Sequence, residues 1–150
     1  MPGANLGKGV IAGFLATVVL SVIMVAKSMA GLMPQLNVIA MLTTVTGVSP
    51  AVGWVVHFQI GTILWGALFA WLDPYLPGAR HWLKGVVFGV GAWLLMMVLF
   101  MPRAGAGFFG MSLGIAAPIV TLVLHVTYGA VLGGVYGAEK PEAVDVAAVL

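Results

Sequence analysis

The sequence contains no cysteine and very little charge. Only 7% of its 150 residues are charged and 62% are hydrophobic, whereas about a quarter of the residues of a soluble domain are charged. The lack of cysteine excludes disulfides, thiolate metal sites and iron–sulfur clusters on this chain. The lack of charge excludes a soluble domain, so we expect an integral membrane protein surrounded by the lipid bilayer.

Two other patterns are also missing. The net charge is +2, but no run of basic residues could neutralise a phosphate backbone, so we expect no nucleic-acid partner. Ten-residue strands of alternating polarity, which a membrane β-barrel requires, do not occur. Helices are the remaining structure that satisfies every backbone amide in lipid. The predicted fold class is therefore an all-α membrane protein.

Four stretches are long and apolar enough to cross a bilayer of about 30 Å as helices. They cover approximately residues 9–30, 51–72, 84–100 and 115–137, and a polar turn at 73–78 joins the second to the third. An even number of spans places both termini on one side. We expect residues 1–150 to form a single membrane domain.

The sequence also repeats itself. Met-Pro, Pro, His and Gly occur at positions 33–34, 50, 57 and 61, and again 68 residues later at 101–102, 118, 125 and 129. A second match, at a spacing of 76, pairs residues 8–10 and 13 with 84–86 and 89. The repeat predicts two parallel helical hairpins, about 8–72 and about 84–137, followed by a tail at 138–150. We expect a four-helix bundle with a pseudo-twofold axis along the membrane normal.

Each hairpin contains a loop of about fifteen residues between its two spans. The first, 35–49, is apolar enough for a short helix, either on the membrane surface or re-entrant, and the second, 103–117, is rich in glycine. Pro34 and Pro102 have no amide hydrogen to donate, so we expect each first span to end or kink there.

The basic residues favour one orientation. Lys27 and Arg103 mark one predicted side of the membrane, and the other side has more positive charge: Lys8, Arg80, Lys84 and Lys140. The positive-inside tendency then places both termini in the cytoplasm. Lys27 and Arg103 become interface residues of the outer side, where the Lys27 ammonium can snorkel out of the hydrocarbon.

His57 and His125 lie at membrane depth, where an ionisable residue is a functional-site hypothesis by default. If both face the axis, they could be the ligand pair of a six-coordinate haem b. Gly61 and Gly129, four residues on, would leave space for the porphyrin edge. Two alternatives are open: each histidine hydrogen-bonds to a backbone carbonyl or to Gln59, Thr121 or Thr127 on a neighbouring helix, or it lines a pore or the site of a quinone-like ligand. No third histidine or carboxylate shares their depth, so we expect no metal site.

Groups for catalysis are scarce. All four acidic residues lie on the predicted cytoplasmic side: Asp73, Glu139, Glu142 and Asp145. None of them can therefore serve a buried acid–base pair. Thr17 and Ser21 have no base near them in the sequence. His81 is expected to be an exposed interface residue. We therefore expect no enzymatic activity.

Three stretches, Lys27–Asn37, Gly53–Gly61 and His125–Gly129, resemble a family of small bacterial four-span membrane proteins with no assigned function. The resemblance implies a bacterial inner-membrane protein near respiratory components, and it assigns no catalytic residue. Three functions remain: an accessory subunit of a larger membrane complex, or of a homo-oligomer; a bis-histidine haem b electron carrier; and a small channel or carrier. The accessory role is favoured because it requires the fewest unobserved features.

Overall fold

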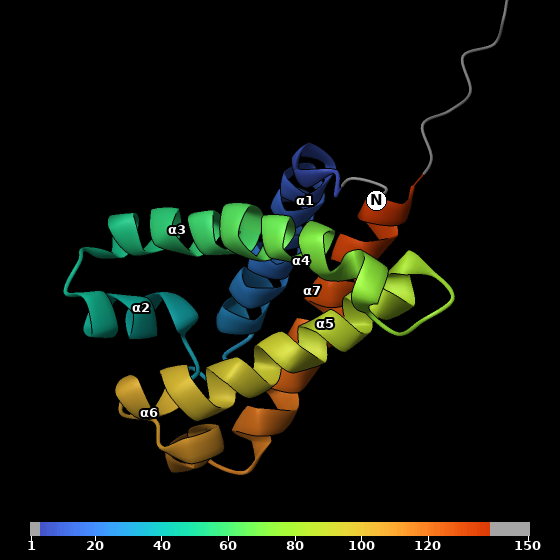
Figure 1. Ribbon diagram of the computed structural model, residues 1–150. Coiled ribbons are helices and arrows are strands. Elements are labelled where there is room, and N and C mark those ends of the chain that lie inside the picture. Colours follow the sequence, from blue (N-terminus) through green and yellow to red (C-terminus); the bar gives the residue numbers. More distant parts are fainter. Residues whose placement is uncertain (1–3, 139–150) are drawn as a thin grey trace, which may run out of the picture.

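The computed structural model describes residues 4–138, and all the secondary structure within this range is helical. Four helical segments are long and apolar enough to cross a membrane: Leu6–Met29, Pro50–Tyr75, His81–Arg103 and Ala116–Gly137. The predicted all-α membrane fold with four spans is confirmed (Figure 1).

The first hairpin consists of α1 (Leu6–Met29) and a composite second span. That span runs through α3 (Pro50–Gln59), the π-helix η1 (Ile60–Trp65), α4 (Gly66–Leu72) and the 3-10 helix η2 (Asp73–Tyr75). The loop between the spans forms α2 (Val38–Thr46), which confirms the predicted short helix. The Asn37 side chain caps the start of α2, and Gly47, in the left-handed conformation, ends it.

The second hairpin begins with α5 (His81–Leu95), the π-helix η3 (Met96–Phe100) and the short α6 (Met101–Arg103). The span ends one residue after Pro102, as predicted, whereas α1 ends at Met29, ahead of Pro34. The glycine-rich loop folds into the 3-10 segment η4 (Phe108–Leu113), and α7 (Ala116–Gly137) completes the hairpin.

Glycines close both hairpins. A Cβ atom on Gly9 would overlap the backbone of Gly66 across the first hairpin, and one on Gly85 would overlap the backbone of Gly129 across the second. Small residues allow such close backbone approach, which is a main source of helix association in lipid. The closely packed glycines of this chain are therefore used within each hairpin.

The two hairpins meet differently on their two sides. α1 packs along α7, where Ala12, Ala16 and Leu132 are fully buried. On the other side the second and third spans meet through aromatic side chains, with the ring of Phe88 5.4 Å from that of Phe69. From this contact α3 and α5 diverge (Figure 1). The pseudo-twofold axis stays a prediction.

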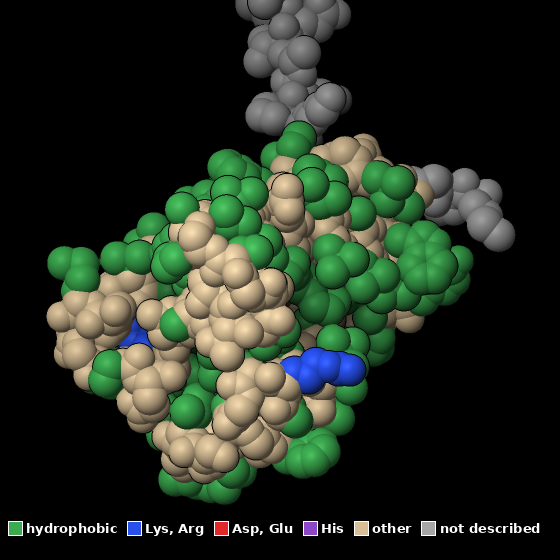
Figure 2. Space-filling view, turned by 90° about the vertical axis from the view of Figure 1, so that its left-hand side faces the viewer, with side chains coloured by type: hydrophobic (Ala, Val, Ile, Leu, Met, Phe, Trp, Pro, Cys, Tyr) green, Lys and Arg blue, Asp and Glu red, His purple; other side chains and the backbone are tan. Residues whose placement is uncertain are grey.

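The two ends of the molecule differ in their number of Lys and Arg side chains. We call residues 27–49 and 103–115 the loop end, and the opposite end, with the start of α1, the turn at 73–80 and the first turn of α5, the terminal end. Lys27 and Arg103 belong to the loop end, and Lys8, Arg80 and Lys84 to the terminal end. Figure 2 looks onto the loop end and shows Lys and Arg side chains among hydrophobic ones, with no Asp or Glu on this described face.

Candidate functional site

His57 joins the second span to the first. It lies in α3, is buried, and places its Nε2 atom 3.2 Å from the Oγ atom of Ser21 on α1. Trp54 and Phe58 meet the imidazole edge to face, with ring centroids 5.8 Å away. His57 thus makes an interhelical hydrogen bond, the first of the two alternatives to haem binding, although its partner is Ser21.

His125 is held within its own helix. Its Nδ1 atom lies 2.8 Å from the backbone oxygen of Thr121, one turn earlier in α7. Its own backbone oxygen lies against Gly89 of α5. The two histidines therefore have different polar partners.

The space beside Gly61 and Gly129 is filled by neighbouring helices. A Cβ on Gly61 would collide with Oγ1 of Thr17 on α1, and one on Gly129 with the backbone oxygen of Gly85 on α5. These glycines let helices touch and leave no room for a macrocycle edge. The residues present therefore do not fit the haem b site predicted between His57 and His125.

The contacts of the two hairpins correspond at one spacing. In the first hairpin Thr17 contacts Gly61, and in the second Gly85 contacts Gly129. One turn further along, Ser21 contacts His57 in the first hairpin, and Gly89 contacts His125 in the second. Each partner is 68 residues from its counterpart. The contacts of Thr17 and Ser21 therefore follow the spacing of 68 residues, and the internal repeat itself stays a prediction. Because Gly89 has no hydroxyl, His125 lacks the partner that Ser21 gives to His57.

Tyr128 makes a contact that sequence reasoning missed. Its hydroxyl is buried and donates a hydrogen bond to the backbone oxygen of Gly61, at 2.6 Å, which links α7 to the π-helix η1. One residue on, the Oγ1 atom of Thr62 is buried without a hydrogen-bond partner in the described chain. Such π-helical turns are frequent at functional sites, but no local sequence pattern predicts this one.

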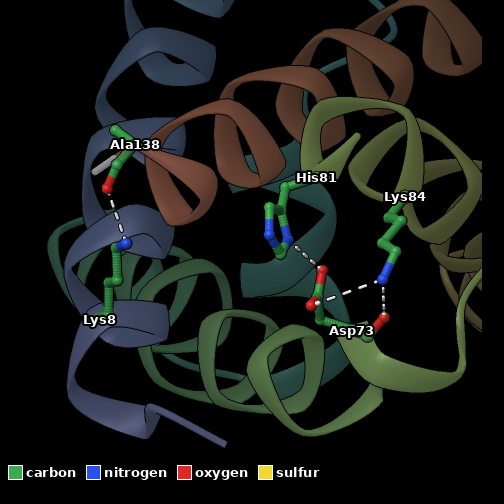
Figure 3. A network of polar contacts seen from close by, with 5 residues as sticks. All are labelled: Lys8, Asp73, His81, Lys84 and Ala138. Atoms are coloured by element: carbon green, nitrogen blue, oxygen red, sulfur yellow. Dashed lines mark hydrogen bonds and ion pairs between the residues drawn. The ribbon is translucent and has the colours of Figure 1, made fainter. Parts of the chain in front are cut away.

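The terminal end contains a network of charged groups (Figure 3). The carboxylate of Asp73, whose side chain is only 8% exposed, lies 2.7 Å from Nδ1 of His81 and 3.8 Å from Nζ of Lys84. Lys84 also donates to the backbone oxygen of Asp73, and Lys8 donates to that of Ala138 at the end of α7. His81, expected to be an exposed interface residue, is 44% exposed and paired with Asp73.

At the loop end, Lys27 organises the chain that follows α1. Its Nζ atom donates to the backbone oxygens of Leu32, Met33 and Leu36 at 2.9–3.0 Å. Three neutral acceptors thus surround an ammonium at the predicted membrane edge. Arg103, the other predicted interface residue, has no hydrogen bond or ion pair with any described residue.

A family model described as a family of unknown function, DUF6789, matches residues 4–144. The chain belongs to DUF6789. No curated protein and no solved structure matches it significantly. The predicted resemblance to four-span membrane proteins of unknown function is confirmed at this level, and the family assigns no reaction to the DUF6789 chain.

Gln59 is the least expected polar residue of the DUF6789 chain. It is one of the partners expected for the histidines, but its side chain is exposed and bonds to no described residue. It lies nine residues after Pro50, about 14 Å along the second span and so near the middle of a bilayer core of about 30 Å. Val55, one turn earlier, and Ile63, one turn later, are more than half exposed on the same span.

Proposed function

We propose that this protein is a non-catalytic accessory subunit of a larger membrane assembly, and that it docks through the exposed face of α3 and η1. We call this face, formed by Val52, Val55, Gln59 and Ile63, the Gln59 face. The observation that carries the proposal is the unpartnered amide of Gln59 at mid-membrane depth. An amide left without hydrogen bonds in hydrocarbon costs several kcal/mol, which a helix of another subunit would remove.

The arrangement of the ionisable side chains supports a docking role over a catalytic one. Among residues 4–138, no three His, Cys, Asp or Glu side chains come together as a metal site. The His57–Ser21 pair has no carboxylate beside it, because Asp73, the acid in the described range, is bound at the terminal end. Glutamine side chains in membranes commonly hydrogen-bond across helices. The Gln59 face offers such a contact.

Substitution of Gln59 by leucine should test this proposal. The change keeps the size and the helical structure but removes the amide, so recovery of co-purifying membrane subunits in mild detergent should fall about three- to tenfold, as expected for one interhelical hydrogen bond of about 0.6–1.5 kcal/mol. Quantitative mass spectrometry of the purified assembly measures the recovery. Yield and thermal stability of the isolated chain should be unchanged or higher, because the substitution removes an unpaired polar group from lipid.

Thr127→Val is the matched control. Thr127 lies in α7, and its hydroxyl bonds to the Val123 carbonyl of the same helix, so its removal should leave partner recovery unchanged. Equal recovery with Gln59→Leu and the control would contradict docking through Gln59. If the purified assembly contains only further copies of this chain, the accessory role is wrong and the Gln59 face serves self-association.

We also propose that the protein lies in a bacterial inner membrane with both termini in the cytoplasm. The charges of the described residues support this orientation, with Lys8, Arg80 and Lys84 at the terminal end and Lys27 and Arg103 at the loop end. Single cysteines at Thr44 and Ala79 can test it against a background free of native cysteine. A membrane-impermeant maleimide should label Thr44→Cys in intact spheroplasts, and Ala79→Cys only after permeabilisation. The reverse pattern would invert the orientation.

A further inference from the structure

A cavity of about 390 Å³ lies at the loop end, between the last turns of α1 and the helices α2 and α3. Its wall is mixed: Met24, Trp54 and Leu124 are among its apolar residues, and it also includes Lys27, Ser28, Asn37 and Thr43. The volume falls in the range of ligand sites in proteins, about 300–1,000 Å³. A ligand here would lie beside a cation and several hydrogen-bonding groups.

A second hollow of about 460 Å³ continues from this cavity along the membrane-spanning part of α1. Its wall is almost entirely apolar and includes Val18, Val22 and Phe58. The two hollows share Val25 and Met29. From Val18 to Met29 the pair extends about 16 Å along the helix. The combined shape has a polar part near the membrane edge and an apolar groove that enters the hydrocarbon.

The charge of the polar part is positive and not neutralised. Lys27 bonds to three carbonyl oxygens, which are neutral, and none of its contacts within residues 4–138 is to a carboxylate. Asp73 lies at the opposite end of the span, bound to His81 and Lys84. Lys27 is part-buried at the membrane edge, where a charge is screened less than in bulk water, so an anionic group beside it is favoured.

Donors for an anion are also available. The Asn37 side chain uses its oxygen to cap α2, with Ala40 N–H as the donor, so its amide nitrogen is left to donate. The Ser28 hydroxyl, also on the wall, makes no hydrogen bond to a described residue. An anionic oxygen near Lys27 would thus meet a charge, an amide and a hydroxyl.

We propose that these two hollows form a binding site for one anionic phospholipid. The phosphate lies beside Lys27, Ser28 and Asn37, and one acyl chain follows α1 past Val25 and Val22 to Val18. A phospholipid is the chemistry that combines a negative head at the membrane edge with a tail long enough for the groove. A zwitterionic lipid such as phosphatidylcholine would fill the groove equally well, but its choline cation offsets the attraction between its phosphate and Lys27, so it gains less.

Native mass spectrometry of the detergent-purified protein can test the site. The protein is titrated separately with phosphatidylglycerol and phosphatidylcholine that have identical acyl chains. One phosphatidylglycerol should bind at about tenfold lower concentration than phosphatidylcholine, the equivalent of about 1.4 kcal/mol. Equal affinity for the two lipids would overturn the proposal, because annular lipid alone shows no such preference.

Two substitutions locate the site without disturbing Lys27, which also holds the loop. Asn37→Asp keeps the helix cap, since aspartate caps as well as asparagine, but it sets a negative charge against the phosphate. It should remove the preference for phosphatidylglycerol and weaken phosphatidylcholine less, because the choline cation balances the charge of its phosphate. Val22→Trp fills the groove and should weaken both lipids.

Val19→Trp is the matched control for the groove. Val19 is 38% exposed on α1 and is not part of either wall, so this variant should bind as the native protein does. Weakening by Val19→Trp equal to that by Val22→Trp would overturn the placement of the acyl chain. Binding of a single-chain fatty acid but not of phosphatidylglycerol would overturn the assignment to a phospholipid.

Discussion

Replacement of Gly85 by alanine should destabilise the second hairpin by about 2 kcal/mol, as overpacking of a tight contact does. A Cβ atom at this position would overlap the backbone oxygen of Gly129 and crowd Gly133. Backbone atoms inside a helix cannot rotate away as a flexible side chain can, so α5 and α7 must move apart. The loss has to exceed the gain of about 0.5–1 kcal/mol that alanine normally brings to a helix interior.

Gly91→Ala provides the comparison on the same helix. Gly91 is exposed, and a Cβ there would meet nothing within 4 Å, so the variant should be neutral or slightly more stable. Unfolding in detergent by increasing dodecyl sulfate, followed by circular dichroism, measures both free energies. Similar losses for Gly85→Ala and Gly91→Ala would mean that close packing of α5 on α7 does not limit stability.

Substitution of Asp73 by asparagine should have an effect of similar size. The nearly buried carboxylate contacts His81 and Lys84, and its loss leaves the Lys84 ammonium without a counter-charge. Breaking a fully buried pair costs about 3–5 kcal/mol, but His81 is partly exposed and solvent weakens the interaction, so we expect about 2 kcal/mol. The same unfolding experiment measures it.

A double-mutant cycle separates the ion pair from packing. His81→Phe keeps an aromatic ring against Tyr136, whose centroid is 5.7 Å from that of His81, but removes the contact with the carboxylate. Asp73→Asn should cost about 1 kcal/mol less in the His81→Phe background than in the native one. Strictly additive losses would show that the Asp73–His81 contact adds nothing to stability.

Much of the fold could be predicted because the governing physics is local. Span length, the polar turn at 73–78 and the short helix after residue 35 follow from apolar stretches and helix-breaking residues. The repeat pointed to the hairpins. For the first helices the sequence offered two spacings, 68 and 76 residues. The contacts of Thr17 and Ser21 with the second span follow the spacing of 68 residues.

The site was harder to predict because it depends on which faces of the helices meet. Periodicity put His57 and His125 at one depth but could not show that Thr17 and Gly85 fill the spaces beside Gly61 and Gly129. The π-helix η1 adds a residue to one turn of the second span, which changes the faces presented after Gln59. The exposure of residues beyond Gln59, such as Ile63, therefore could not be derived from a regular helical wheel.

The packing of α1 on α7 has a consequence for the order in which the protein matures. Membrane spans are synthesised one after another, so the α1 face that α7 covers must wait in lipid until the last helix has been inserted. That face includes Ala12 and Ala16, whose small apolar side chains tolerate lipid at little cost. The Tyr128–Gly61 hydrogen bond also forms only at this step. The contacts between the first hairpin and α7 are thus completed later than the glycine packing inside that hairpin.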